Sequence, residues 1–176
     1  MTSQNFKISL IAALGGKSRV IGNSHGKSAK EQIPWNLPQD MKYFREKTKD
    51  HIVIMGKTTF ESMDSKPLKN RINIVLTHKK ENTSKDVHFC NDLPECLSLC
   101  SELVEKGAES EVFVIGGAKI YSLFLNLADK LYLTLIEGEF QGDVYFPDYN
   151  NQFTQATTSE KHRDGNLSYQ FVEFVK

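Results

Sequence analysis

Short apolar runs alternate with segments of helical spacing along most of the chain. Continuous apolar runs are typical of buried strands, and they occupy residues 6–14, 52–55, 72–76, 112–115 and 131–136. Between these runs, apolar residues three to four positions apart predict helices at 40–49, 59–63, 93–106 and 118–127. This alternation predicts an α/β fold with a largely parallel central sheet.

The C-terminal part of the chain has a different pattern. Residues 153–161 and 167–175 flank an Asp164-Gly165 turn, and Tyr169 and Phe171 take alternate positions in the second segment. An Asp-Gly pair between two alternating segments is a strong signal for a hairpin. We therefore expect a C-terminal antiparallel hairpin, which makes the sheet mixed.

Residues 18–32 form a long polar stretch whose only apolar residues of note are Val20 and Ile21. A loop of this length is uncommon in a small domain, so we expect a gate over a functional site. Its run Gly22-Asn23-Ser24-His25-Gly26-Lys27-Ser28 is one residue short of a phosphate-binding loop, and Pro34 leaves little room for the helix which that motif requires. A phosphate-loop kinase or hydrolase remains a minor alternative.

The composition describes an ordinary globular chain. Its 176 residues are 39% hydrophobic and 25% charged, which predicts one folded domain over 1–176. Lys plus Arg and Asp plus Glu both number 22, so no net charge draws the chain to nucleic acid or to a membrane surface. The apolar run at 8–14 is far shorter than the roughly 20 residues of a membrane span. We expect neither partner, and we expect a monomer.

The cysteines Cys90, Cys96 and Cys100 are odd in number and show neither a Cys-x-x-Cys spacing nor a paired histidine. This pattern argues against a disulfide framework and against a metal site. Cys96 and Cys100 are four positions apart in a predicted helix, where small buried side chains are common. We therefore expect buried thiols, no bound metal and a reducing, cytoplasmic location.

Two glycine-containing turns connect a predicted strand to a predicted helix. Gly56 follows the strand at 52–55, and Gly116 and Gly117 follow the strand at 112–115. Glycine lets the backbone approach a ligand closely, and the free amides of a helix N-terminus attract phosphate. Plain tight turns would have the same sequences, so the pattern alone leaves both interpretations open.

Polar and cationic side chains accompany these turns. Thr58 and Glu61 match the Ser/Thr-x-x-Glu pattern of a helix capping box, whereas Lys57 can meet a phosphate. The cluster His78-Lys79-Lys80 follows the strand at 72–76, and no acidic residue stands at that strand end. Cations at this place suit a 2′-phosphate, whereas an acidic residue would suit a free ribose hydroxyl.

One carboxylate lies among apolar and aromatic residues, in Ile33-Pro34-Trp35-Asn36-Leu37-Pro38-Gln39-Asp40-Met41-Lys42-Tyr43-Phe44. The prolines fix the entry into the predicted helix, and the helix dipole favours Asp40 in its first turn. Asp40 and Phe44 share a helix face because they are four positions apart. An exposed first-turn aspartate would give the same local pattern, but the aromatic surroundings make Asp40 a candidate catalytic residue.

The order and spacing of these motifs resemble the dihydrofolate reductase family of the bacterial type. The motifs are Pro34-Trp35-Asn36-Leu37-Pro38-x-Asp40, Ile54-Met55-Gly56-Lys57-x-Thr59-Phe60-Glu61-Ser62 and Val114-Ile115-Gly116-Gly117-Ala118-x-Ile120-Tyr121. With Gly142-Asp143-x-x-Phe146-Pro147 and the hairpin, the resemblance covers essentially the whole chain. It implies a central mixed sheet of eight strands flanked by four helices, and NADPH-dependent reduction of 7,8-dihydrofolate to tetrahydrofolate for one-carbon metabolism.

The resemblance also implies how the substrate is held. Asp40 would bind the 2-amino group and a ring nitrogen of the pterin, hydride would reach C6, and water near Asp40 would supply the proton at N5. Burial should raise the pKa of Asp40. Arg71 matches the arginine that pairs with the glutamate carboxylate of folate, and Thr134 is expected to hydrogen-bond Asp40. Trimethoprim or methotrexate, which are antifolates, would bind here too. The other expected substrate-binding residues are Ile11, Ala13, Ile33, Trp35, Met41, Phe44, Met63, Leu68, Ile115 and Tyr121.

NADPH would lie across the sheet with its diphosphate on the helix starts after Gly56 and Gly117. The segment between Gly22 and Pro34 is longer than the usual bacterial lid, so the detail of the lid is not carried over. The residues expected to contact the cofactor are Ala13, Ile21, Gly56, Lys57, Thr58, Thr59, Leu76, Thr77, His78, Lys79, Ile115, Gly116, Gly117, Ala118, Lys119, Ile120 and Tyr121.

Two further alternatives share the fold but not the activity. One is a nucleotide-binding module that has lost catalysis, which would bind NADPH without consuming dihydrofolate. The other is a reductase of pterin or riboflavin metabolism, which would not be expected to carry Trp35 and Asp40 in this arrangement.

Overall fold

The computed structural model describes residues 4–27, 29–79 and 86–176 of the chain. Its strands are β1 (Lys7–Gly15), β2 (Val20–Gly22), β3 (Ile52–Gly56), β4 (Ile72–Leu76), β5 (Val87–Cys90), β6 (Glu111–Gly116), β7 (Lys130–Ile136), β8 (Val144–Tyr145), β9 (Gln155–Thr158), β10 (His162–Asp164) and β11 (Leu167–Val175). Its helices are α1 (Ala29–Gln32), α2 (Pro38–Thr48), α3 (Lys57–Ser62), α4 (Leu93–Glu105) and α5 (Ala118–Phe124), which continues as a 3-10 turn at Leu125–Leu127.

Eight strands cross the sheet in the order β10-β11-β7-β1-β6-β3-β4-β5, and β2, β8 and β9 pair at its margins. The six strands from β7 to β5 in that order are parallel. β11 is antiparallel to β7, β9 and β10. The predicted mixed eight-stranded α/β sheet with four flanking helices and a C-terminal hairpin is therefore confirmed, and α1 is an additional short helix.

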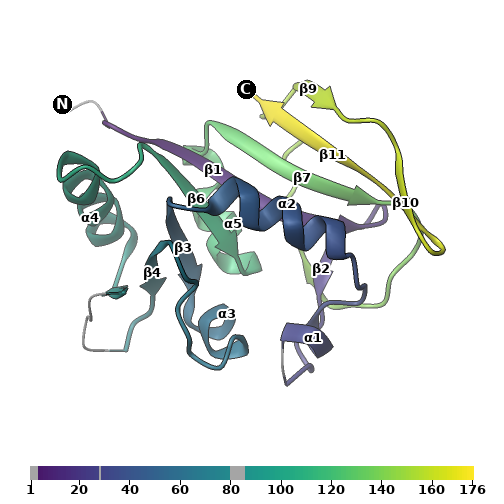
Figure 1. Ribbon diagram of the computed structural model, residues 1–176, viewed down its shortest axis with the longest axis horizontal. Coiled ribbons are helices and arrows are strands. Elements are labelled where there is room, and N and C mark those ends of the chain that lie inside the picture. Colours follow the sequence, from purple (N-terminus) through teal and green to yellow (C-terminus); the bar gives the residue numbers. More distant parts are fainter. Residues whose placement is uncertain (1–3, 28, 80–85) are drawn as a thin grey trace.

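Alternate residues of the strands pack into different apolar clusters, because successive side chains of a strand point to opposite faces. On β1, Ile8 and Leu10 join the cluster that contains Cys96 of α4 and Phe124 of α5. Ile11 joins a second cluster on the other face. Helix α2 crosses in front of the sheet in Figure 1, on the face of this second cluster. The sheet is thus covered on both sides, as expected for parallel strands with continuous apolar runs.

Several elements differ from the sequence-based expectations. The stretch 18–32 is not one loop, because it contains β2, which pairs with β1 and β8, and the single turn α1. β5 was missed because it has only four residues, of which His88 is polar. The helix expected at 118–127 ends at Phe124. The hairpin arm expected at 153–161 contains β9, but the strand that pairs next to the turn, β10, begins only at His162.

The three cysteines are free and buried, as expected. Cys90, Cys96 and Cys100 all lie in the larger apolar cluster. Within the part of the chain that the structure describes, no group of histidine, cysteine or acidic residues could hold a metal ion. None of the helices described has the length and apolar character needed to cross a bilayer.

Leu10→Ala is expected to lower the free energy of unfolding by about 2–5 kcal/mol, the usual cost of a cavity at a fully buried leucine. Leu10 lies on the central strand β1 and is 0% exposed. Leu123→Ala is the control, because Leu123 is 42% exposed and its loss should cost less than about 0.5 kcal/mol. Urea unfolding followed by circular dichroism measures both. Equal midpoints for the two variants would contradict the assignment of Leu10 to the core.

Candidate active site

Asp40 lies in the first turn of α2, where the local sequence places it. Leu37 is the N-cap residue with an extended backbone, and Pro38 occupies the first helical position, where its missing N–H costs nothing. The Asp40 carboxylate then reaches the sheet, where the hydroxyl of Thr134 on β7 donates a hydrogen bond of 2.6 Å to its Oδ1. The expected pairing of these two residues is confirmed, although they are 94 positions apart.

Two opposing effects act on the pKa of Asp40. Burial disfavours the charged form and raises the pKa, whereas the hydrogen bond from Thr134 stabilises the carboxylate and lowers it. Burial is the larger effect, so the pKa of Asp40 lies above its ordinary value. A carboxyl group with a raised pKa in a partly apolar site can hold or release a proton nearer neutral pH than an exposed one.

An apolar wall lies beside this carboxylate. Phe44 on the same helix packs with Met63, Leu68 and Ile115 against a cluster that includes Ile11 of β1. Met41 and Ile33 leave 46% and 39% of their surface exposed. A mostly apolar surface with a carboxylate beside it suits a flat ring that carries a few polar atoms.

Ala13 and Trp35 belong to a neighbouring cluster rather than to this wall. Both pack around Leu37 and Ile136, and the Trp35 ring meets Phe140 edge to face at 5.1 Å. Gly15 allows this arrangement, because a Cβ at that position would lie 2.5 Å from the Trp35 ring. Ala13 is in register with Thr134 across β1 and β7, so its backbone still lies next to the Asp40 contact.

The two glycine turns meet at one edge of the sheet. β3 and β6 are parallel neighbours, with Met55 in register with Gly116, so α3 and α5 begin side by side. A Cβ on Gly56 would lie 3.0 Å from the side chain of Ile120, and one on Gly117 would lie 3.5 Å from Thr59 Oγ1. Gly116 has a φ of +122°, which favours glycine. Gly56 and Gly116 thus let the two helix starts pack closely against neighbouring side chains, where a Cβ would be crowded.

Other residues expected near a cofactor lie around this edge. Ala118 begins α5 and is partly buried, whereas Lys119 is exposed, and Ile21 and Leu76 pack at the margin of the larger cluster. The hydroxyl of Tyr121 is buried and donates a hydrogen bond of 2.7 Å to the Ile11 carbonyl. Burial raises the pKa of Tyr121, with a smaller contribution from Asp40, so this phenol remains protonated.

The expected capping box at Thr58 and Glu61 is wrong. The N-cap residue of α3 is Gly56, and no side chain caps this helix. Thr58 is therefore already the second helical residue, and it is exposed. A capping hydroxyl must stand at the residue that precedes the first turn, but here the strand runs directly into the helix. Lys57, whose ammonium lies 3.9 Å from Glu61, is at the first helical position.

The basic cluster after β4 is partly described. His78 and Lys79 are exposed, and Lys80 lies outside the described residues. The backbone N–H of Lys79 donates to Thr77 Oγ1 at 3.2 Å, and the N–H of Thr77 donates to the Cys90 carbonyl at 2.8 Å. These bonds hold the turn against β5, so the exposed cations stand at the carboxyl end of the parallel strands.

Arg71 is held at the last turn of α2. Its Nη2 donates to the Arg45 carbonyl at 2.8 Å, and its Nε and Nη2 donate to Thr48 Oγ1 at 3.2 and 3.1 Å. Its Nη1 donates to the Lys69 carbonyl at 2.7 Å. The sequence analysis identified Arg71 as a candidate, but it did not identify the two carbonyl groups and the hydroxyl that hold its guanidinium.

Asn73 is a positioning residue that the sequence analysis missed. It is 0% exposed, and its amide donates to the carbonyls of Leu68 and Arg71 and accepts from the Leu68 N–H. Asn73 therefore fixes the turn that carries Leu68, a member of the apolar wall, and Arg71. The signal was present, since a single amide inside the apolar strand Ile72–Leu76 needs buried partners.

Asp143 was also missed as a contact of the predicted gate. Its Oδ1 accepts from the Ser24 N–H at 2.7 Å, and its Oδ2 accepts from the Ser24 hydroxyl and lies 3.8 Å from His25 Nε2. The loop between β7 and β8 thereby contacts the segment after β2. Nothing in local periodicity links positions so distant in the chain.

Comparisons with known proteins cover almost the whole chain. A sequence model of the family described as dihydrofolate reductase matches residues 7–176. The chain belongs to the dihydrofolate reductase family. It is 37% identical to a dihydrofolate reductase of Bacillus subtilis, covering 96% of this chain and 94% of that protein. It is 40% identical to one of Buchnera aphidicola subsp. Schizaphis graminum, covering 94% and 95% of the two chains.

A solved structure agrees with this membership. The dihydrofolate reductase from Enterococcus faecalis, complexed with NADP(H) and RAB-propyl, superimposes with a TM-score of 0.77 at 26% identity. The match covers 98% of this chain and 96% of that one. The phosphate-loop alternative is wrong, because the family match covers this segment. In addition, the Lys27 backbone N–H, which a phosphate-binding loop would offer to its phosphate, donates to the Glu31 carboxylate at 2.9 Å. Ser28 lies outside the described residues.

Asp40→Asn is expected to raise the stability of this dihydrofolate reductase family member at pH 7. The pKa of Asp40 is higher in the folded state than in the unfolded state. Its protonated form therefore stabilises the fold at pH values below the ordinary pKa, and this stabilisation is lost as the pH rises through the folded-state pKa. The amide of the variant stays neutral, so it avoids the cost of burying a charged carboxylate at pH 7. The difference in Tm between the variant and the wild type should shrink as pH falls toward about 4. Thermal unfolding between these pH values measures it. A wild-type protein that is more stable at pH 7 would contradict the dominance of burial.

Proposed function

We propose that Asp40 is the catalytic residue of this chain and binds the pterin of dihydrofolate through its carboxylate. As a member of the family, the chain is an NADPH-dependent oxidoreductase that reduces 7,8-dihydrofolate to 5,6,7,8-tetrahydrofolate, a carrier in one-carbon metabolism. The single observation that carries the residue assignment is the partly buried Asp40 carboxylate, which is held by Thr134 beside an apolar wall. A carboxylate matches an amino group and an adjacent ring N–H through two parallel hydrogen bonds.

The other substrate contacts follow from the same arrangement. Phe44, Met63, Leu68 and Ile115, with Ile11, would hold the pterin and benzoyl rings. The Arg71 guanidinium would pair with the glutamate carboxylate, since its planar fork suits that group. Inhibitors that copy the pterin, such as trimethoprim or methotrexate, would compete for Asp40. The remaining proposed substrate contacts are Ala13, Ile33, Trp35, Met41, Tyr121 and Thr134.

The glycine turns fit NADPH. Among the described residues, no side chain caps the helix starts after Gly56 and Gly117, so their N–H groups can meet a diphosphate. Thr59, which lies beside Gly117, would be a further contact. His78 and Lys79 stand exposed at the strand ends, where cations suit a 2′-phosphate. When bound, NADPH supplies the hydride that is transferred to C6 of dihydrofolate. Further proposed contacts are Ala13, Ile21, Lys57, Thr58, Leu76, Thr77, Ile115, Gly116, Ala118, Lys119, Ile120 and Tyr121.

We propose that the proton required at N5 comes from water near Asp40. Burial raises the pKa of the Asp40 carboxyl group, which supports this role. Water that enters beside the exposed Met41 side chain would lie within reach of this carboxyl group. Asp40 would then hold or orient that water while the apolar wall excludes bulk solvent from the ring.

We further propose that the chain acts as a monomeric, single-domain protein in the cytoplasm. Strands from both ends of the chain pair in one sheet, which supports one domain. The three buried free thiols suit a reducing compartment. The neutral net charge and the presence of all the expected motifs within one chain support a monomer without nucleic-acid or membrane partners.

Asp40→Asn is expected to lower dihydrofolate-dependent oxidation of NADPH by about two orders of magnitude or more, while NADPH binding is retained. Absorbance of NADPH with and without dihydrofolate measures turnover, with NADH as the cofactor control. Undiminished turnover in the variant would remove Asp40 from the mechanism. Binding of NADPH by the wild type without any turnover would instead support the module that has lost catalysis.

Gly116→Ala is expected to weaken NADPH binding at least about tenfold, because the new Cβ would lie 3.3 Å from the Tyr121 hydroxyl in a backbone conformation that favours glycine. Gly107→Ala is the matched control, since Gly107 has a φ of +103° and no atom within 4 Å of its Cβ position. Both variants carry backbone strain, but only the first lies at the cofactor edge. Fluorescence titration with NADPH separates them, and equal affinities would contradict the role of the turn.

A further inference from the structure

Helix α2 contacts the sheet at three successive levels along one of its faces. Asp40 meets Thr134, the Tyr43 ring stacks on Phe171 with centroids 4.1 Å apart, and Lys47 Nζ lies 3.1 Å from Glu173 Oε1. Positions 40, 43 and 47 share a helix face because they are three and four residues apart. The helix therefore has one anchor at each end, and the anchor at its C-terminal end is an ion pair.

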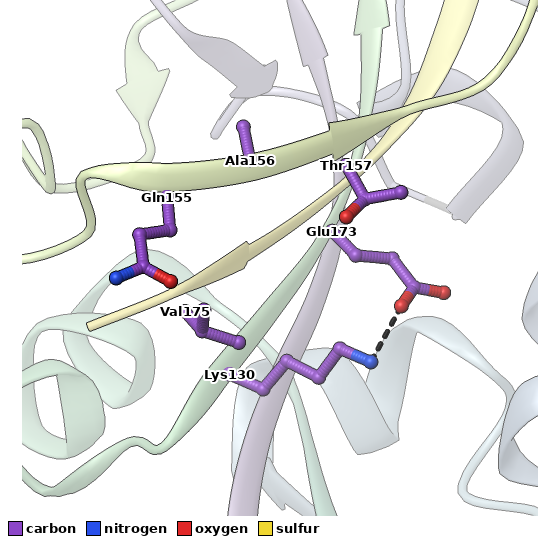
Figure 2. Close-up of a pocket in the computed structure, with 6 residues that line it drawn as sticks. All are labelled: Lys130, Gln155, Ala156, Thr157, Glu173 and Val175. Carbon is purple, nitrogen blue, oxygen red and sulfur yellow. Dashed lines mark ion pairs between the residues drawn. The ribbon is translucent and has the colours of Figure 1, made fainter.

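The ion pair is part of a compact charged group on β7 and β11. The second oxygen of Glu173 accepts from Lys130 at 2.5 Å, and Figure 2 shows these two side chains pointing toward each other. Both residues line a pocket of about 230 Å³. The ammonium groups of Lys47 and Lys130 lie 4.9 and 4.4 Å from the centroid of the Tyr132 ring. Tyr132 is held in turn by a hydrogen bond of 3.0 Å from its hydroxyl to Glu111.

The electrostatics of this group favour a charged Glu173. Partial burial opposes ionisation, but hydrogen bonds from Lys130 and Lys47 outweigh it, so the pKa of Glu173 lies below its ordinary value. The side chains of Lys47, Lys130 and Glu173 are 35%, 28% and 32% exposed, which places the group between a surface pair and a buried pair. Such a pair adds modest stability but defines a geometry.

The last turn of α2, next to this anchor, is also the frame for Arg71. The guanidinium donates to the Arg45 carbonyl and to Thr48 Oγ1, which lie on either side of Lys47 in the sequence. A shift of this turn would move both acceptors together, and Arg71 would move with them. The first turn is held separately by the bond between Asp40 and Thr134.

We propose that the ion pair between Lys47 and Glu173 is a positioning device for Arg71, and that it sets the affinity for the glutamate end of the substrate. The inference rests on the proposed pairing of Arg71 with the glutamate carboxylate. It assigns the two ends of α2 to the two ends of the substrate: the Thr134 anchor serves the pterin, and the Glu173 anchor serves the glutamate. Glu173 and Lys47 act through the helix and contact neither substrate nor cofactor.

The test compares dihydrofolate with 7,8-dihydropteroate, which has the same pterin and benzoyl rings but no glutamate. Glu173→Gln and Lys47→Met are each expected to raise KM for dihydrofolate about threefold with little change in kcat, the size of effect expected for a partly exposed ion pair. With dihydropteroate, neither substitution should change KM. Glu46→Gln is the matched control, because Glu46 pairs with Lys42 at 3.8 Å on the same helix without touching the sheet.

A charge exchange keeps the result specific to the ion pair. Lys47→Glu combined with Glu173→Lys retains one carboxylate and two ammonium groups, and it is expected to restore the dihydrofolate KM toward that of the wild type. An equal rise of KM for both substrates, or the same rise in Glu46→Gln, would overturn the inference in favour of general destabilisation. Unchanged KM in both single variants would overturn it as well.

Arg71→Ala separates this inference from the proposed function. It is expected to raise KM for dihydrofolate far more than for dihydropteroate. If Arg71→Ala shows that difference and Glu173→Gln does not, the positioning role is wrong and the proposed substrate contact stands. If Arg71→Ala raises neither KM, the assignment of Arg71 to the glutamate is wrong, and the inference falls with it.

Discussion

The hydrogen bond between Thr134 and Asp40 is the interaction on which the arrangement of the candidate site depends. A carboxylate that is mostly removed from water needs a partner, and Thr134 supplies one from the face of a central strand. Thr134 is in register with Ala13 of β1 and Phe171 of β11. For Asp40 to reach it, α2 must cross this face of the sheet, which brings Phe44 to the apolar cluster and the last turn of the helix to Arg71.

A second constraint comes from the parallel strands. The carboxyl ends of β3, β4 and β6 lie at one edge because these neighbours run in the same direction. Gly56, Thr77 and Gly116 therefore lie at the same edge although they are separated along the chain, and each is followed by a turn or a helix start. Open parallel sheets bind ligands at this edge for the same geometric reason. The apolar wall beside α2 and this edge meet at β6, where Ile115 and Gly116 are consecutive residues.

Charge in this protein is balanced overall but unevenly placed. Lys47, Lys130 and Glu173 gather on the same sheet face as Asp40, and the aromatic ring of Tyr132 lies under both cations. The partly buried carboxyl that serves the proposed chemistry lowers stability at neutral pH, whereas the partly exposed charges add modest stability and hold a helix in place. On helix α2, Asp40 thus serves the proposed function at a cost in stability, whereas Lys47 contributes to stability.

The sequence by itself determined the main strands, the four flanking helices and the family, and it singled out Asp40 as the candidate catalytic residue. These results depend on periodicity and on motifs within a few residues. The same local patterns mistook Thr58 for a capping residue and 18–32 for one loop, since an N-cap depends on where the strand ends and β2 depends on its partners β1 and β8. Tertiary structure alone decided which distant residues hold these segments: Asn73 holds Leu68 and Arg71, Asp143 holds Ser24, and Glu173 holds Lys47. Sheet register and helix placement set these contacts between distant positions, and no local pattern records them.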